Sequence, residues 1–354
     1  MTRTPILLRL LVVSSAACAP LCAQTPLFTD GSTFGGSQVF SEGLNPNGNP
    51  ARIGQAPAGY YLSFVDGEQR AKDNKSILST LNSSSGSAAS AALGQLANAP
   101  WAQHTRAYGF AATKSASSLT LTREELNGLL ASTDLNAADL GAGLGSNGST
   151  LTATRAVVNR LGLGCGAPVE SGIAAGLNLR VESWQEGQQS ASYASFSGFS
   201  NAEGMLDSST TTDRTLALGL DGGVVFDVAT GVRLGATATQ LNAKRLWNVD
   251  QKPQFRAGLQ LDLGSQVKVS LESDINSAER MPFPVKQQTA DASLRYAISQ
   301  AAVFILGVEQ KKIAGDSINT AGATLQIRTS SLLLSFGFQA GQDTPMKSAT
   351  LGFL

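Results

Sequence analysis

Apolar and polar side chains alternate strictly along many segments in the second half of the chain. The segment 255–264 places every second residue on an apolar face, and the segment 267–275 repeats the pattern after the turn at Gly264-Ser265. About eleven such segments occur between Val157 and Leu354, each near the 9–11 residues that a tilted membrane strand requires. The pattern predicts an all-β chain of consecutive antiparallel hairpins.

Two architectures produce this alternation. A β-sandwich buries the apolar faces of its strands, whereas a transmembrane barrel turns them toward lipid and keeps polar faces in the lumen. Strand length favours the barrel, because sandwich strands are usually about 5–6 residues long. The content of 3 Trp and 5 Tyr is small for a barrel with aromatic girdles. We therefore expect an antiparallel transmembrane β-barrel, with a secreted or lipid-anchored β-sandwich as the alternative.

The first 23 residues have the features of a signal peptide. Arg3 and Arg9 precede and flank an apolar stretch, and Leu21-Cys22-Ala23 resembles a cleavage site. The segment predicts export, which agrees with a membrane barrel. Lipidation of Cys18 or Cys22 remains an alternative, since an acyl chain on either would anchor the protein.

The first half of the mature chain differs from the second. Residues 24–57 are rich in Gly, Asn and Pro, which predicts an irregular segment or plug, and the barrel is expected over 58–354. Apolar residues at helical spacing predict a helical insert near 74–99. Thr122-Arg123-Glu124-Glu125 matches a capping box, which predicts a second insert near 122–140.

Composition narrows the classes of function. The chain has 26 Lys+Arg and 26 Asp+Glu, so it lacks the positive charge that a nucleic-acid binder uses to neutralise phosphates. After the signal segment no apolar run reaches the roughly 18 residues of a transmembrane helix. We expect a lipid bilayer as a partner, and no nucleic acid.

Catalytic patterns are weak. His104 is the only histidine, which removes His-based zinc clusters and Ser-His-Asp triads. Residues 143–148 match the spacing of a dinucleotide-binding loop, but no βαβ unit surrounds them, and Ser265-x-x-Lys268 lies at a hairpin instead of on a helix. We expect no enzyme activity, no catalytic residues, no cofactor and no metal.

Charged residues on the polar faces are candidates for the lumen. They oppose one another in sign, so they either form cross-strand ion pairs in a filled interior or line a constriction that selects solutes. The candidate lumen-lining residues are Arg180, Glu182, Arg233, Arg256, Asp262, Lys268, Glu272, Asp274, Arg295 and Arg328.

Several short segments carry a resemblance to a known family. Asn49-Pro50-Ala51, Phe64-Val65-Asp66-Gly67, the helical insert and the stretch 252–275 resemble the TraF-like (plasmid conjugal-transfer) outer-membrane family, which is close to the FadL-like transporter barrels. The resemblance implies a barrel of about fourteen strands with an N-terminal plug. The candidate plug residues are Asn49, Pro50 and Ala51. The chain departs from such barrels in ending with Leu354 behind Phe353, since these barrels commonly end in an aromatic residue.

These observations together predict a protein of the outer membrane of a Gram-negative-type bacterium. Its expected role is passive: passage of hydrophobic or small solutes, or a part in a conjugal-transfer or secretion complex. A hydrophobic small molecule or envelope-complex proteins would then be partners. The alternative sandwich would act as a surface adhesin or structural protein.

Overall fold

A computed structural model describes most of the strand-forming part of the chain. The described residues are 37–40, 48–55, 57–70, 102–131, 150–192, 213–242, 244–246, 249–280, 285–313, 316–340 and 346–354. The predicted signal segment, much of the predicted plug and the helical insert expected near 74–99 lie outside these residues.

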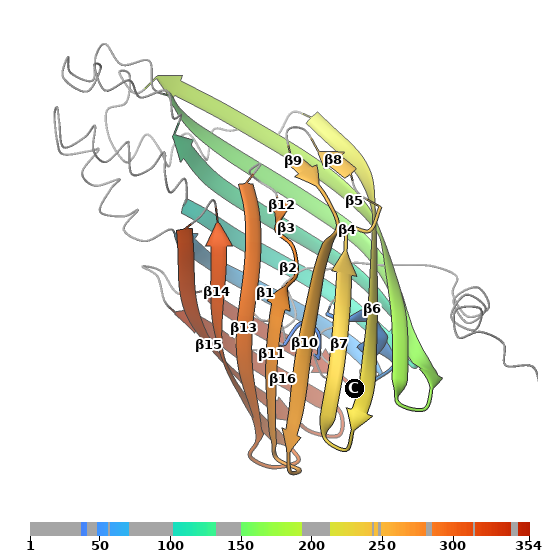
Figure 1. Cartoon of the computed structure of the whole chain (residues 1–354). Helices are drawn as coiled ribbons and strands as arrows, with labels where there is room; N and C mark the ends of the chain where they lie inside the picture. Colours follow the sequence, from blue (N-terminus) through green and yellow to red (C-terminus); the bar gives the residue numbers. More distant parts are fainter. Residues whose placement is uncertain are drawn as a thin grey trace, which may run out of the picture.

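Fourteen antiparallel strands form one closed sheet (Figure 1). In order around the sheet they are β1 (Gly59–Arg70), β2 (Ala102–Lys114), β3 (Ser117–Ala131), β4 (Thr150–Glu170), β5 (Ile173–Ser192), β6 (Asp213–Ala229), β7 (Val232–Thr239), β10 (Gln254–Leu263), β11 (Val267–Asp274), β13 (Val285–Ala297), β14 (Ala302–Ile313), β15 (Asp316–Arg328), β16 (Leu332–Ala340) and β17 (Met346–Phe353). β12 (Ala278–Arg280) adds to β13 beyond the end of β11, and β8 (Lys244–Leu246) pairs with β9 (Val249–Gln251) as a separate hairpin.

The ladder closes between the first and the last of these strands. Tyr60 of β1 pairs with Phe353 of β17, and Asp66 pairs with Lys347 six residues further along the same seam. A closed ladder leaves no free edge strand, and it forms one sheet where a sandwich needs two. The β-sandwich alternative is therefore wrong, and the barrel expected from the alternation is confirmed.

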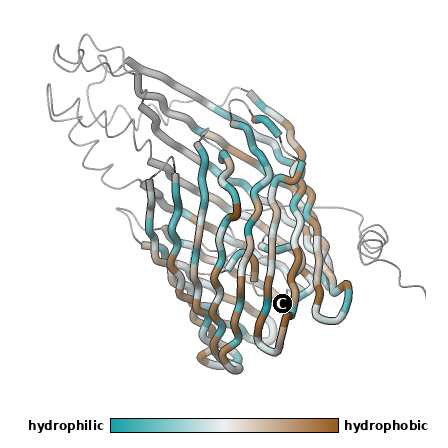
Figure 2. Tube along the Cα trace, viewed as in Figure 1, coloured by the Kyte–Doolittle hydropathy of each residue, from teal (hydrophilic) through white to brown (hydrophobic). Residues whose placement is uncertain are grey.

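Large apolar side chains cover the outer face of the barrel. Along β1 the exposed residues Tyr60, Leu62 and Phe64 alternate with the buried Tyr61 and Ser63. The other strands repeat this pattern with exposed Leu121, Leu161, Val181, Leu218, Leu234, Leu271, Leu294, Leu306, Phe336 and Phe338. Figure 2 shows apolar residues concentrated in the lower part of the barrel and more polar residues toward its upper end. A continuous apolar belt of this kind is the lipid-facing surface of a transmembrane barrel.

The two ends of the barrel differ in their connections. Tight turns join strands at the lower end in Figure 1, where Gly231 and Gly264 adopt positive φ angles of 77° and 81° that favour glycine. The turn predicted at Gly264-Ser265 is present there. We call this the turn end and the opposite end, where most connections are longer, the loop end. No helix among the described residues is long and apolar enough to cross a membrane.

The helix expected to start at Thr122 is absent, because Ser117–Ala131 forms β3. Thr120, Thr122 and Glu124 are buried on the lumen side, and Leu121 between them is exposed on the outside. The segment pairs with β2 and β4, and its polar and apolar residues alternate with period two. These features determine its structure, whereas the capping pattern is only a local signal. The prediction for 122–131 is therefore wrong, and residues 132–140 lie outside the described part.

Candidate functional site

The lumen holds a short N-terminal segment. A 3₁₀ helix, η2 (Pro50–Gln55), packs against β3, β4, β5 and β6 from inside the barrel, and its residues Pro50–Ile53 are buried. Asn49 precedes the helix and joins it to the wall. Its side-chain Nδ2 donates to the carbonyl oxygens of Val224 at 3.1 Å and Ala236 at 3.4 Å, while its Oδ1 accepts from the Ala51 N–H at 3.0 Å. The structure thus places Asn49, Pro50 and Ala51 within the lumen.

Glycines in the wall make room for η2. A Cβ atom at Gly166 of β4 or Gly176 of β5 would overlap the carbonyl oxygen of Pro50, and one at Gly223 of β6 would overlap the side chain of Asn49. These three glycines lie on adjacent strands and have no side chains. They leave a recess in which the plug backbone contacts the sheet directly. The glycine-rich polar faces of these strands are therefore explained by the plug.

A second anchor holds the plug at residues 37–40. The Glu272 carboxylate on β11 accepts hydrogen bonds from the backbone N–H groups of Gln38 at 3.1 Å and Val39 at 3.0 Å, and from the hydroxyl of Ser37. The Ser37 Oγ in turn accepts from the Phe40 N–H at 2.7 Å. One carboxylate therefore serves as acceptor for consecutive donors of the plug, which is the strong, charge-assisted form of hydrogen bond.

Glu272 belongs to a buried charged group, the Glu272 cluster, made of Arg256, Glu272, Asp274 and Asp291. The Arg256 Nε lies 3.2 Å from a Glu272 oxygen, its Nη1 lies 3.7 Å from Asp274, and its Nη2 pairs with Asp291. The same guanidinium donates to the side-chain oxygen of Gln38 at 3.2 Å. Three carboxylates surround one cation, and plug N–H groups offset part of the negative charge.

A second buried group, the Glu182 cluster, comprises Glu124, Arg160, Arg180, Glu182, Asp221 and Lys244. The Arg180 Nε lies 3.2 Å from a Glu182 oxygen and its Nη2 lies 2.7 Å from Asp221, while the Arg160 Nε lies 3.7 Å from Glu182. Lys244 pairs with Glu182 from the β8–β9 hairpin. Three cations balance three carboxylates, so this cluster is neutral in total.

Trp184 and Leu246 close the Glu182 cluster on its apolar side. The Trp184 Nε1 donates to Glu182 at 2.7 Å, and the Arg160 guanidinium lies 5.3 Å from the centre of the indole ring. Leu246 packs on Trp184 together with Ala156 and Val158. Burial here lowers the pKa of the Lys244 ammonium, against the opposing charge of Glu182.

A third group lies at the turn end and is partly exposed. Arg233 pairs with Asp227 at 2.9 Å and with Asp262 at 3.3 Å, and Lys268 lies 4.0 Å from Asp262. Arg295 is half-buried and aligned with Lys268 across β11 and β13. Cross-strand ion pairing accounts for these contacts.

The predicted lumen residues therefore divide into three sets. Arg180 and Glu182 lie in one buried cluster, Arg256, Glu272 and Asp274 in another, and Arg233, Asp262 and Lys268 in the group at the turn end. Arg328 joins none of these groups: it is exposed at the end of β15.

Sequence reasoning missed several members of the clusters. Asp291 lies two residues before Ser293 on the polar face of β13, so extending that alternation would have found it. Glu124 has the same signal on β3 and was hidden by the helical interpretation of that segment. Arg160 and Asp221 continue polar faces on β4 and β6. Lys244 has no such signal, because a hairpin outside the barrel sheet brings it to Glu182.

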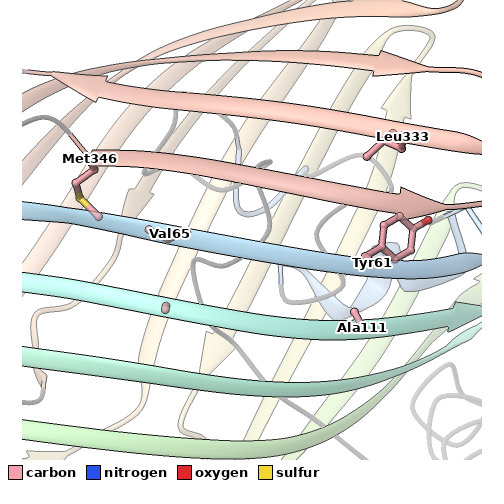
Figure 3. Packing of buried hydrophobic residues seen from close by; sticks show 6 residues of the cluster. Tyr61, Val65, Ala111, Leu333 and Met346 are labelled. Atoms are coloured by element: carbon pink, nitrogen blue, oxygen red, sulfur yellow. The ribbon is translucent and has the colours of Figure 1, made fainter.

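On β1, β2, β16 and β17 the buried side chains are uncharged, and polar ones such as Ser63, Ser335 and Thr350 lie between the apolar ones. Six buried residues from β1, β2, β16 and β17 form one packed group, the apolar wall: Tyr61, Val65, Ala107, Ala111, Leu333 and Met346. Figure 3 shows them along adjacent strands, from Met346 toward one end to Tyr61 and Leu333 toward the other. The Tyr61 hydroxyl donates to the Pro57 carbonyl at 2.6 Å, so its polar atom is satisfied at the turn end. Among the described residues no group of His, Cys, Asp and Glu is arranged to hold a metal ion.

No protein-family model matches the chain, and no curated protein matches it. Solved structures do. The chain aligns with the toluene transporter TbuX of Ralstonia pickettii at a TM-score of 0.54 and 10% identity, covering 93% of this chain and 97% of that one. It aligns with the toluene transporter TodX of Pseudomonas putida at 0.52 and 9% identity, covering 94% and 97%. For the monoaromatic hydrocarbon channel CymD the values are 0.52 and 10%, covering 92% and 96%. The chain thus has the same barrel fold as these three proteins.

Proposed function

We propose that this protein is an outer-membrane barrel that lets hydrophobic small molecules pass without an energy source. The observation that carries the proposal is the closed barrel, with an apolar belt on its outer face and a segment packed inside its lumen. The fold supports it, because barrels of the same fold are a toluene transporter and a monoaromatic hydrocarbon channel. Toluene and similar uncharged aromatic molecules are the proposed substrates.

The arrangement of charge inside the barrel suits such a substrate. Transfer of an apolar molecule out of water lowers its free energy by about 25 cal/mol per Å² of buried apolar surface. The Glu182 cluster pairs its charges internally and the Glu272 cluster has an excess of carboxylates, so both present charged groups that do not attract an apolar molecule. Passage is therefore proposed along β1, β2, β16 and β17.

The plug is proposed to be the gate. Its contacts with the wall are polar through Asn49 and Glu272, and apolar through Val39, Phe40 and Ala51, which pack with Val225 of β6. The hydrogen bonds of Asn49 are exchangeable for water at a net free energy of about 0.5–1.5 kcal/mol each, and those to the charged Glu272 at about 1.5–3 kcal/mol each. Residues 37–40 and 48–55 belong to no strand of the barrel sheet, so the segment can leave its place without breaking the backbone pairing of the wall. The predicted signal segment and the apolar belt together support the outer membrane of a Gram-negative-type bacterium as the location.

A TraF-like role in conjugal transfer or secretion is a second candidate. One observation favours keeping it: the segments that carry that resemblance include Asn49–Ala51 and 252–275, and these form the plug and the strands β10 and β11 that hold Glu272. Deletion of the gene for this chain in its host distinguishes the two roles. Loss of hydrocarbon uptake supports transport, and loss of DNA transfer with normal uptake supports the second candidate.

Uptake measurements test the proposed transport. The full chain is expressed in a host without its own monoaromatic channel, and entry of labelled toluene is compared with that of a sugar. Ala107→Trp fills the apolar wall, and the matched control Ala112→Trp places the same ring on the outer face of β2. We expect toluene uptake above the empty-vector level, its loss in Ala107→Trp and its retention in Ala112→Trp.

A folded barrel that leaves toluene entry at the vector level would overturn the proposal. Folding is monitored in every variant by the gel mobility of unheated and heated samples, since a closed ladder keeps its shape in detergent until heated.

A further inference from the structure

The β8–β9 hairpin covers part of the barrel wall without belonging to the barrel sheet. Among the described strands β8 and β9 pair only with each other, so no backbone ladder joins them to the barrel. Figure 1 shows the hairpin at the loop end, where β9 contacts β12 and the Asp250 N–H donates to the Glu279 carboxylate at 2.8 Å. A single hairpin of two short strands has little stability of its own. Its position therefore depends on the side chains that it places against the wall.

Two side chains of β8 hold the hairpin against β5. Lys244 and Leu246 are two residues apart, so they lie on the same face of the strand. Lys244 forms its ion pair with Glu182, and Leu246, which is 1% exposed, packs on Trp184. The attraction within a buried ion pair is largely offset by the free energy needed to remove both charges from water. The burial of Leu246 is therefore the main net contribution of β8 to the closed position.

The base of the hairpin is attached to β6. The Leu241 N–H donates to the Leu220 carbonyl at 2.7 Å. The Asn242 side chain accepts from the Leu220 N–H at 2.9 Å and donates to the Leu218 carbonyl at 2.7 Å. These bonds fix residues 241 and 242, whereas β8 beyond them has no backbone pairing with the barrel sheet. The hairpin can therefore turn away from the wall about its base while the barrel ladder stays intact.

Leu246 fills an apolar recess in the wall, which we call the Trp184 recess. It is made of Ala156 and Val158 on β4 and Trp184 on β5, and Val158 pairs directly with Trp184. The two β4 side chains are smaller than the indole beside them, and this difference leaves the space that Leu246 occupies. Apolar cavities stay dry and accept small apolar molecules, and an indole packs well against another aromatic ring. Withdrawal of the hairpin would therefore vacate a site for such a molecule.

The Trp184 recess lies in the same row of side chains as part of the apolar wall. Trp184 pairs with Val158, and Val158 pairs with Glu124. Glu124 pairs in turn with Ala107, and Ala107 pairs with Val65. Ala107 and Val65 belong to the apolar wall, and the carboxylate of Glu124 between the two apolar parts is held in a buried ion pair. A molecule released from the recess thus lies beside the apolar wall.

We infer that the Trp184 recess binds an uncharged apolar small molecule, and that the β8–β9 hairpin is an autoinhibitory lid whose Leu246 occupies this site in the closed state. The inference rests on the proposed transport, because the recess would be the first binding position on the way to the apolar wall. A monoaromatic hydrocarbon is the ligand class, since it matches the aromatic and aliphatic side chains of the recess and carries no charge.

The fluorescence of Trp184 tests the lid. Trp101 and Trp247 are replaced by Phe in the purified full chain, so that Trp184 is the only tryptophan of this parent protein. Lys244→Glu then places a carboxylate against Glu182, and like charges should drive the hairpin from the wall.

Lys252→Glu is the matched control. It makes the same change of charge in the same connection, but the Lys252 side chain is 69% exposed and pairs with Asp250 instead of the wall. Every variant is first shown to be folded by its gel mobility before and after heating.

We expect the emission of Trp184 to move to longer wavelength in Lys244→Glu and to be quenched more strongly by acrylamide, because water reaches the indole. Toluene should reverse the change, with an apparent affinity about tenfold higher than in the parent, as a larger open fraction predicts. Lys252→Glu should resemble the parent. Unchanged emission in folded Lys244→Glu would overturn the lid.

A second pair of variants carries no change of charge. Leu246→Ala removes the side chain that fills the recess, and Leu241→Ala removes an exposed leucine at the base of the same hairpin. Toluene should bind more tightly to Leu246→Ala than to Leu241→Ala. Equal binding would show that Leu246 does not occupy the site. Leu246 lies outside the barrel sheet, so this pair decides the question even when Lys244→Glu misfolds.

Toluene uptake by cells separates failure of this inference from failure of the proposed function. Faster uptake with Lys244→Glu than with Lys252→Glu supports the lid, and equal uptake contradicts it. Toluene that enters through the parent protein without changing the emission of Trp184 in any variant would leave transport in place and overturn the recess. A change of emission without entry above the vector level would leave the recess in place and overturn transport.

Discussion

The Glu272 carboxylate accepts the backbone N–H of Val39 at 3.0 Å, across 233 residues of sequence. The contact joins the plug to β11 in the lumen. Because the same carboxylate also accepts from Gln38 and Ser37, one side chain fixes the position of three consecutive plug residues.

Replacing Glu272 by Ala should free the plug while the barrel stays folded. Each lost bond to the charged acceptor contributes about 1.5–3 kcal/mol. We therefore expect faster toluene entry in Glu272→Ala than in the wild type. Asp262→Ala is the control, since Asp262 pairs with Arg233 at the turn end. Equal toluene uptake in the wild type and Glu272→Ala would show that the hydrogen bonds between the plug and Glu272 do not limit passage.

A methyl group at Gly166 should displace η2. The added Cβ would overlap the Pro50 carbonyl oxygen, and the flat backbone of β4 has no room to yield. The buried Arg52 should then become a trypsin site, so cleavage after Arg52 in Gly166→Ala is the measurement. Gly222→Ala is the matched control, because its Cβ would meet the Leu241 side chain at 3.3 Å instead of the plug. Resistance of Gly166→Ala to trypsin would contradict the tight fit.

Removing Arg180 should destabilise the barrel wall. Its guanidinium pairs with Glu182 and Asp221, both fully buried, so truncation leaves carboxylates without their main cation. Breaking such a pair from one side typically lowers the free energy of unfolding by about 3–5 kcal/mol. In Arg180→Ala the heat-dependent change of gel mobility should occur at a lower temperature, and Arg180→Lys should restore part of the loss. An unchanged transition in Arg180→Ala would mean that water replaces the guanidinium.

The sequence predicted the barrel because period-two alternation is local information. It also placed Arg256, Glu272 and Asp274 on polar faces of neighbouring strands, and ladder pairing then brings them together. Where two local signals disagreed, at Thr122, the capping pattern gave the wrong element, since pairing with β2 and β4 depends on distant strands.

The plug contacts were beyond local reasoning. Nothing in the spacing of Ser37 or Asn49 indicates that one meets β11 and the other β6 and β7. Lys244 reaches Glu182 by a hairpin whose direction no strand pattern predicts. The alternation thus shows which face of each strand points into the lumen. The contacts made inside the lumen depend on residues far apart in the sequence.

Pairing of β1 with β17, from Tyr60 and Phe353 onward, must be the last step of barrel closure. Contacts between β1 and β17 span nearly the whole described sequence, and such long-range pairing folds slowly. Until β17 arrives, β1 and β16 each present an unpaired edge beside exposed apolar side chains, which is a template for aggregation. The barrel therefore closes only when β17, the last strand, is present. Any chaperone that accompanies the chain must cover the edge of β1 until then.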